Sequence, residues 1–80
     1  MEEQEIREKV KHVIVEKLNV DENKINDDAK YVEDLGADSL ALVDIAMALE
    51  DEFQMQIPDE DIEKITTFGS TVDYIKQHIK

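Results

Sequence analysis

Residues 33–40 read Glu-Asp-Leu-Gly-Ala-Asp-Ser-Leu, and an apolar and acidic segment follows them. Gly36 favours a turn there. Asp38 or Ser39 then provides the N-cap of a helix, because residues 40–53 keep helical spacing without Gly or Pro. The start of such a helix has free backbone N–H groups and a positive dipole end, which together favour a phosphate. Ser39 is therefore placed to carry a phosphodiester, although Ser and Asp at this position are more commonly caps alone.

Negative charge dominates the chain and is concentrated in its middle. Nine Lys and Arg against 21 Asp and Glu give a net charge of −12 over 80 residues. Residues 31–63 contain eleven acids and no Lys or Arg. A polyanionic surface argues against nucleic acids and anionic membranes as partners and favours proteins with basic patches. A merely solubilising face is the simpler alternative, but solvated helices usually mix charges to gain i,i+4 pairs.

The length fits a single domain over residues 1–80, which we expect to be a monomer. Without Cys there is neither a disulfide framework nor a thiolate metal site. The apolar run at residues 40–43 is far too short to span a membrane. The N-terminus is acidic and lacks an apolar core, so we expect no signal peptide and a cytoplasmic location.

The first part of the chain predicts one long helix and one long loop. Residues 3–18 keep helical spacing, with an apolar stripe at Ile6, Val10, Val13, Ile14 and Leu18. The connection over residues 19–36 is expected to be pinned across the bundle, with a helical turn near residues 31–35, by its apolar residues Val20, Ile25, Ala29, Tyr31, Val32 and Leu35. No metal site is expected, because His12 and His78 are isolated and the acidic loop fails the EF-hand pattern.

The predicted helix over residues 39–53 has two apolar faces. One face is expected to enter the core through Leu42, Ile45 or Ala46, Leu49 and Phe53. The other consists of Leu40, Val43 and Met47. These three side chains either belong to the core as well or remain partly exposed. An exposed apolar strip beside Asp44, Glu50 and Asp51 would suit docking to a basic, apolar groove.

Two further helices complete the predicted fold. Pro58 fits the first position of a short helix whose first turn holds Asp59, Glu60 and Asp61 and whose inner side chains are Ile62 and Ile65. Thr66 or Thr67 caps a last helix over residues 68–79, with Phe68, Val72, Ile75 and Ile79 inward and Lys76 and Lys80 at its negative end. The expected fold is an all-α four-helix bundle with three longer helices, one short helix and a long first loop.

Nothing in the sequence forms a catalytic constellation. No His accompanies a nucleophile, there is no Gly-rich phosphate loop, and Ser39 has no base in the chain to activate it. The protein is therefore expected not to be an enzyme. A serine at the start of a helix, without catalytic residues to activate it, is best interpreted as a site that other enzymes modify.

Four segments carry a family resemblance over essentially the whole chain. They are Leu-Gly-Ala-Asp-Ser-Leu at residues 35–40, Met-Ala-Leu-Glu-Asp-Glu-Phe at 47–53, Ile-Pro-Asp-Glu at 57–60 and Lys-Ile-Thr-Thr at 64–67. In order and spacing they resemble the acyl carrier proteins of bacterial type II fatty acid synthesis. The resemblance implies that a phosphopantetheinyl transferase attaches 4′-phosphopantetheine from coenzyme A to Ser39, between Asp38 and Leu40. The thiol of that arm would carry the growing fatty acyl chain as a thioester.

The resemblance also implies two surfaces. Fatty acid synthesis enzymes with basic patches would dock on the helix after the serine and on the short helix, through Leu40, Val43, Asp44, Met47, Glu50, Asp51 and Glu60. The acyl chain would enter a cavity between the helices lined by Ala46, Leu49, Phe53, Ile57, Ile62, Ile65 and Ile75. These seven residues can equally form an ordinary core, and both interpretations can hold at once.

Two departures from the family pattern leave alternatives open. Many members carry an acid directly after Asp-Ser-Leu, where this chain has Ala41, and Ala46 is smaller than the usual residue. A specialised acyl, aminoacyl or peptidyl carrier of a secondary pathway is therefore an alternative. An acidic helical binding module without a cofactor is another. The sequence leaves open which acyl groups are carried and whether the serine is already modified.

Overall fold

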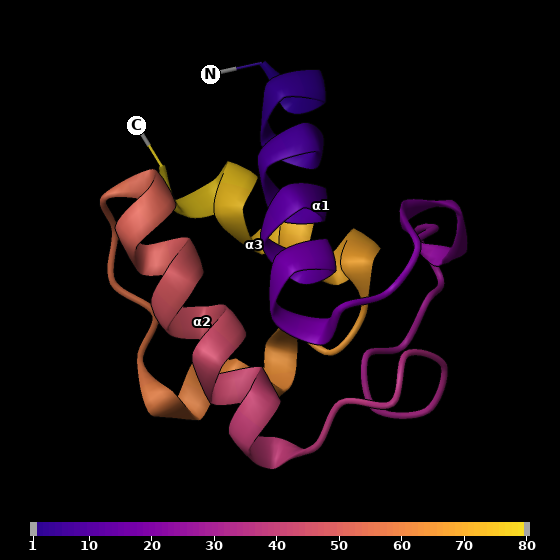
Figure 1. Cartoon of the computed structure of the whole chain (residues 1–80). Helices are drawn as coiled ribbons and strands as arrows, with labels where there is room; N and C mark the ends of the chain where they lie inside the picture. Colours follow the sequence, from indigo (N-terminus) through magenta and orange to yellow (C-terminus); the bar gives the residue numbers. More distant parts are fainter. Residues whose placement is uncertain (1, 80) are drawn as a thin grey trace.

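The computed structural model describes residues 2–79 and shows three α-helices and two short 3₁₀ helices (Figure 1). In chain order they are α1 (Glu3–Leu18), η1 (Glu22–Lys24), α2 (Ser39–Phe53), η2 (Asp59–Lys64) and α3 (Phe68–His78). Residues 2–79 contain no strand, and a single isolated bridge joins Lys30 and Thr67. The prediction of an all-α fold with three longer helices, a short helix near residue 60 and a long first loop is confirmed.

Helix α1 packs against both α2 and α3. Its predicted stripe faces the core: Ile6, Val10, Val13 and Ile14 are buried, and Leu18 packs partly buried against them. The helix ends at Asn19, which adopts a left-handed conformation and donates its N–H to the carbonyl of Val15 at 2.8 Å. Asn tolerates this conformation better than most residues, so the sequence itself ends the helix here.

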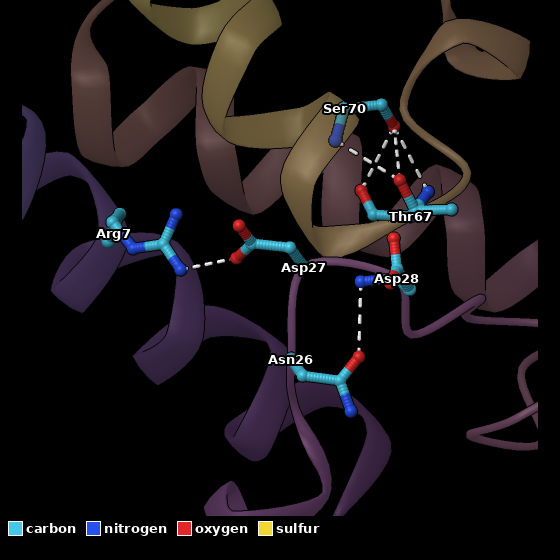
Figure 2. Close-up of polar contacts among 6 residues, drawn as sticks. All are labelled: Arg7, Asn26, Asp27, Asp28, Thr67 and Ser70. Carbon is cyan, nitrogen blue, oxygen red and sulfur yellow. Dashed lines mark hydrogen bonds and ion pairs between the residues drawn. The ribbon is translucent and has the colours of Figure 1, made fainter.

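The long loop between α1 and α2 is bound to two helices, α1 and α3. Figure 2 shows Asp27, in this loop, forming an ion pair with Arg7 of α1. On its other side the Asp27 carbonyl accepts the Gly69 N–H of α3 at 3.0 Å. The Phe68 N–H donates to the carbonyl of Ala29 at 3.2 Å. The loop therefore holds α1 and the start of α3 together.

Most of the apolar loop residues pack inward as expected. Ile25, Ala29, Tyr31 and Leu35 are buried. The expectation for Val32 is wrong, because its side chain is 50 % exposed. The chain near residues 31–35 forms hydrogen-bonded turns without a regular helix, and the 3₁₀ turn η1 is an element that the sequence pattern did not predict.

Helix α3 begins with a reciprocal capping box. The Thr67 Oγ1 accepts the Ser70 N–H at 3.1 Å, and the Ser70 Oγ accepts the Thr67 N–H at 3.1 Å (Figure 2). Thr67 is therefore the cap among the two predicted candidates. The helix ends at His78, one residue earlier than expected, with Ile79 partly buried beyond it. The prediction for Lys80 lies outside the described residues.

The short helix η2 is tied to α3 by a side-chain hydrogen bond. The Tyr74 hydroxyl donates to Asp61 Oδ2 at 2.6 Å. This hydrogen bond is the main reason why the pKa of the Asp61 carboxyl lies below its usual value. Pro58 precedes η2 in an extended conformation, so the prediction that it occupies the first helical position is wrong by one residue. Its fixed φ of −60° suits the N-cap equally well.

The core is one cluster of buried side chains drawn from all three α-helices and both connecting segments. Two side chains with hydroxyl groups that the sequence analysis did not assign, Thr71 and Tyr74, are also buried. The hydroxyls of both are hydrogen-bonded, as buried polar groups generally are. Among the helices of residues 2–79, none is sufficiently long and apolar to cross a bilayer. The same residues bring no three potential metal ligands together.

Candidate functional site

The turn at Gly36 sets the position of the site. Gly36 has φ +75°, a conformation that favours glycine, and it is exposed between two buried neighbours, Leu35 and Ala37. The Ala37 N–H donates to the Tyr31 carbonyl at 2.8 Å. Because Tyr31 is itself completely buried, this hydrogen bond fixes the chain immediately before α2 to the core.

The sequence left open whether Asp38 or Ser39 caps the helix, and the structure gives the two residues different positions. Asp38 is the N-cap of α2, and its Oδ1 accepts the N–H of Ala41 at 2.8 Å. Ser39 is the first residue of the helix, and its side chain is exposed. By helix geometry the amides of Ser39 and Leu40 have no partner within α2, and the helix dipole is positive at this end. Ser39 therefore presents a hydroxyl to solvent where negative charge is favoured.

A surface hollow of about 580 Å³ opens beside Ser39, between α2 and η2. Leu42, Val43 and Ile62 give it apolar walls. The acidic side chains at its edge all come from η2: Asp59, Glu60 and Glu63. An apolar chain attached to Ser39 would thus find an apolar surface within reach, bordered by carboxylates.

Helix α2 exposes the second apolar face that the sequence predicted. Leu40 is 74 % exposed, Val43 39 % and Met47 60 %. Ile45, on the other side of the same helix, is completely buried. The interpretation that all apolar residues of α2 belong to the core is therefore wrong, and α2 carries an unpartnered apolar strip directly after Ser39.

The acidic residues predicted beside this strip are mostly free at the surface. Asp44, Asp51 and Glu60 are exposed. Glu50 is half-buried, and its Oε2 accepts the Ile57 N–H at 3.0 Å. Glu50 thus helps to hold the segment that leads to η2, in addition to any role at the surface. A second, larger hollow of about 880 Å³ between α1 and α2 is also lined by Asp44, Met47, Glu50 and Asp51.

The seven residues predicted to line an acyl cavity are brought together by the fold. Ala46, Leu49, Phe53, Ile57, Ile65 and Ile75 are buried in the core cluster, and Ile62 packs against it at the surface. Ile62 is the member of this set that also lines the hollow beside Ser39. It therefore contacts both the hollow beside Ser39 and the core cluster that holds the other six side chains.

Four residues of the hollow were not singled out from the sequence: Leu42 as a surface contact, and Asp59, Glu63 and Thr66. The pattern gave a signal for two of them, because Asp59 and Glu63 belong to the same acidic turn as Glu60. Leu42 was assigned to the core, and it is partly buried, so it serves both environments. Thr66 gave no signal beyond its candidacy as a helix cap.

A comparison with protein families places this geometry in context. Residues 8–75 match the family described as phosphopantetheine attachment site. The match includes α2 and the residues around the hollow, and it spans well over half of the chain. The chain therefore belongs to the phosphopantetheine-attachment family of acyl and peptidyl carrier domains, which are carriers rather than enzymes and hold a covalently attached 4′-phosphopantetheine.

Proposed function

We propose that the chain is an acyl carrier protein of type II fatty acid synthesis and that Ser39 is its attachment residue. The observation that carries this proposal is the position of Ser39: an exposed hydroxyl at the first residue of α2, beside an apolar hollow. The chain has one other serine, Ser70, whose hydroxyl accepts the Thr67 N–H in the capping box of α3 and donates to the Thr67 carbonyl. Ser39 is therefore the better candidate for a phosphodiester.

The residues around Ser39 fit the cofactor. The positive end of α2 suits the phosphate, and the amides of Ser39 and Leu40 belong to the first turn, where backbone N–H groups have no partner within the helix. Asp38 already caps the third helical amide, so these first amides remain available. When attached, the group supplies a terminal thiol, which this chain lacks entirely because it has no Cys.

The attachment step needs a phosphopantetheinyl transferase and coenzyme A. A new phosphodiester bond forms between Ser39 Oγ and the phosphorus that bears the pantetheine arm. The pyrophosphate bond of coenzyme A breaks, and adenosine 3′,5′-bisphosphate leaves. The proton of the Ser39 hydroxyl passes to a base of the transferase, since this chain offers none. The contribution of the chain is to present the hydroxyl and to stabilise the new negative charge.

The surface of α2 and η2 supports transient docking to enzymes with basic, apolar patches. Leu40, Val43 and Met47 offer exposed apolar contacts. Asp44 and Asp51 line the hollow between α1 and α2 together with Met47, and Glu60 lines the hollow beside Ser39 together with Val43. Opposite charges accelerate encounter, while a small interface allows rapid release. A carrier needs both, because it must leave each enzyme after every step. We further propose that the protein acts as a monomer in the cytoplasm.

The cargo is proposed to enter the bundle past Ile62. This side chain lines the hollow beside Ser39 and packs against the core that contains Leu49, Ile65 and Ile75. Small residues such as Ala46 leave room for neighbouring side chains to shift. The hydrogen bond between Tyr74 and Asp61 keeps η2, and with it Ile62, in place.

Loading experiments test the class of cargo. Once the modified protein carries a malonyl group, purified type II fatty acid synthesis enzymes should build an acyl chain on it in successive steps. Intact mass follows the growth of this acyl chain. An aminoacyl or peptidyl carrier would instead accept an amino acid from an adenylating enzyme and fail to support elongation. Acyl elongation supports the proposal. Aminoacyl loading without elongation would assign the chain to a secondary pathway.

A further inference from the structure

The large apolar side chains that the structure exposes are confined to the surroundings of Ser39. Within residues 2–79 they are Val32, Leu40, Val43 and Met47. All four lie in residues 32–47, and Ser39 stands at the middle of that interval. Three of them belong to the strip on α2. Val32 precedes the serine, and no role assigned so far includes it.

The exposure of Val32 is set by the fold. Residues 30–35, which we call the Val32 turn, are closed by backbone hydrogen bonds: the carbonyl of Lys30 accepts the N–H groups of Asp34 at 2.8 Å and Leu35 at 3.2 Å. The Lys30 N–H donates to Asp34 Oδ2 at 2.9 Å. Tyr31 and Leu35 are buried on either side of the exposed residues. The turn is thus anchored at both ends and holds Val32 outward.

The Val32 turn lies close to the serine. The hydrogen bond between the Tyr31 carbonyl and the Ala37 N–H, 2.8 Å long, joins the two segments. Three residue steps and this bond separate Val32 from Ser39, so their Cα atoms are at most about 18 Å apart. A standard protein interface covers about 800 Å² on each partner, which corresponds to a patch about 30 Å across. Because this width exceeds the bound of about 18 Å, a single interface of standard size can cover both Ser39 and Val32.

The charge around Val32 matches that of the α2 strip. Glu33 and Asp34 are exposed beside it, and the following residues carry no Lys or Arg until Lys64. Lys30 is the nearest base in the sequence, and its Nζ is paired with Glu33 Oε2 at 3.4 Å. An apolar side chain among carboxylates thus appears on both sides of the serine. The complementary surface is an apolar pocket with Lys and Arg at its rim.

We propose that the Val32 turn is a second part of the docking surface and contacts the transferase that modifies Ser39. This inference rests on the proposed function, because it takes the transferase as the partner. Val32 acts as a specificity residue in this contact: its side chain is buried by an apolar pocket of the transferase, while Glu33 and Asp34 face basic residues. It takes no part in the chemistry, so its loss should raise KM and leave kcat nearly unchanged.

Transfer kinetics with a purified phosphopantetheinyl transferase and coenzyme A test the contact. Val32→Thr keeps the shape of the side chain and replaces a methyl with a hydroxyl, and we expect kcat/KM to fall about fivefold. Val32→Asp should lower it more than tenfold. Gln77→Glu, on the exposed surface of α3, adds the same charge as Val32→Asp elsewhere and should stay within twofold of the unaltered chain. Melting curves of each variant verify that it is folded.

A crosslinking measurement gives a second readout that is independent of turnover. The chain has no Cys, so Val32→Cys in a Ser39→Ala background offers one site for a benzophenone label. Irradiation should join this label to the purified transferase, and the same label at Gln77→Cys should not. Equal crosslinking from both positions, or Val32 variants that are modified as fast as the unaltered chain, would overturn the proposal. If the unaltered chain itself gains no phosphopantetheine, the proposed function fails and the contact fails with it.

Discussion

Tyr31 and Thr71, forty residues apart in the chain, share a buried hydrogen bond of 2.5 Å between their hydroxyl groups. Both side chains are completely buried. Thr71 Oγ1 also donates to the carbonyl of Thr67 at 2.7 Å, so Tyr31 is left as the donor to Thr71. The pair joins the segment that leads to Ser39 to the first turn of α3.

This geometry predicts unequal effects for two conservative substitutions. Tyr31→Phe should lower the free energy of unfolding by about 1 kcal/mol, because Thr71 keeps its bond to Thr67. Thr71→Val should cost more, about 1–3 kcal/mol, because it leaves the buried Tyr31 hydroxyl without its partner. Urea unfolding of the single and double variants measures both effects. If Tyr31→Phe destabilises the Thr71→Val variant as much as it destabilises the unaltered chain, the two hydroxyls do not interact.

Gly69 should resist a substitution that normally stabilises helices. A Cβ at this position would lie 2.8 Å from the Asp27 carbonyl oxygen, the backbone atom that accepts the Gly69 N–H. Gly69→Ala should therefore destabilise the protein by about 1–3 kcal/mol, since the loop must move away. Gln77→Ala, exposed in the same helix, serves as the control and should be neutral or slightly stabilising. Thermal melting of both variants measures the change in stability. An increase in Tm for Gly69→Ala would contradict the predicted clash between its Cβ and the Asp27 carbonyl oxygen.

The two tyrosines should make the protein sensitive to alkaline pH. Burial raises the pKa of the Tyr31 phenol, and burial together with the hydrogen bond to Asp61 raises the pKa of Tyr74 to about 12. In the unfolded chain both phenols titrate near about 10. Above that pH the unfolded state releases protons that the folded state retains, so this stabilisation is complete below pH about 10 and is lost as pH rises through about 12.

Urea unfolding between pH 9 and 12, at steps of about half a unit, measures this loss. Tyr74→Phe removes one of the two phenols and should flatten the decline over the same range. A slope that is identical with and without the Tyr74 hydroxyl would show that its raised pKa contributes nothing to stability.

Local signals in the sequence predicted the three longer helices, the short helix near residue 60 and the position of Ser39 at the start of α2, and they failed where distant segments meet. A cap at Asp38 or Ser39, the two faces of α2 and the core side of α1 follow from spacing and side-chain chemistry within a few residues, and the structure selects Asp38 as the cap. The Tyr31–Thr71 pair joins positions whose proximity depends on the whole fold. Val32 is apolar, like the buried loop residues Tyr31 and Leu35, so the sequence pattern does not distinguish it from them. Its exposure follows from the hydrogen-bonded turn in which it lies.

The two faces of α2 should respond to substitution in opposite ways. Met47→Ser changes an exposed side chain and should leave the free energy of unfolding within about 0.5 kcal/mol, while lowering the rate of phosphopantetheine transfer. Ile45→Ala truncates a completely buried side chain and should cost about 2–5 kcal/mol. Where it remains folded, its transfer rate should stay near that of the unaltered chain. Equal loss of stability from both variants would show that the α2 strip is part of the core.

The central claim, that Ser39 carries the cofactor, is tested most directly by the intact mass of the purified chain before and after incubation with coenzyme A and a phosphopantetheinyl transferase. Ser39→Ala and Ser70→Ala, which alter the two serines of the chain in turn, are measured in parallel. We predict a gain of one phosphopantetheine group for the unaltered chain and for Ser70→Ala, and none for Ser39→Ala. A gain that persists in Ser39→Ala, or no gain in a folded and previously unmodified chain, would contradict the assignment.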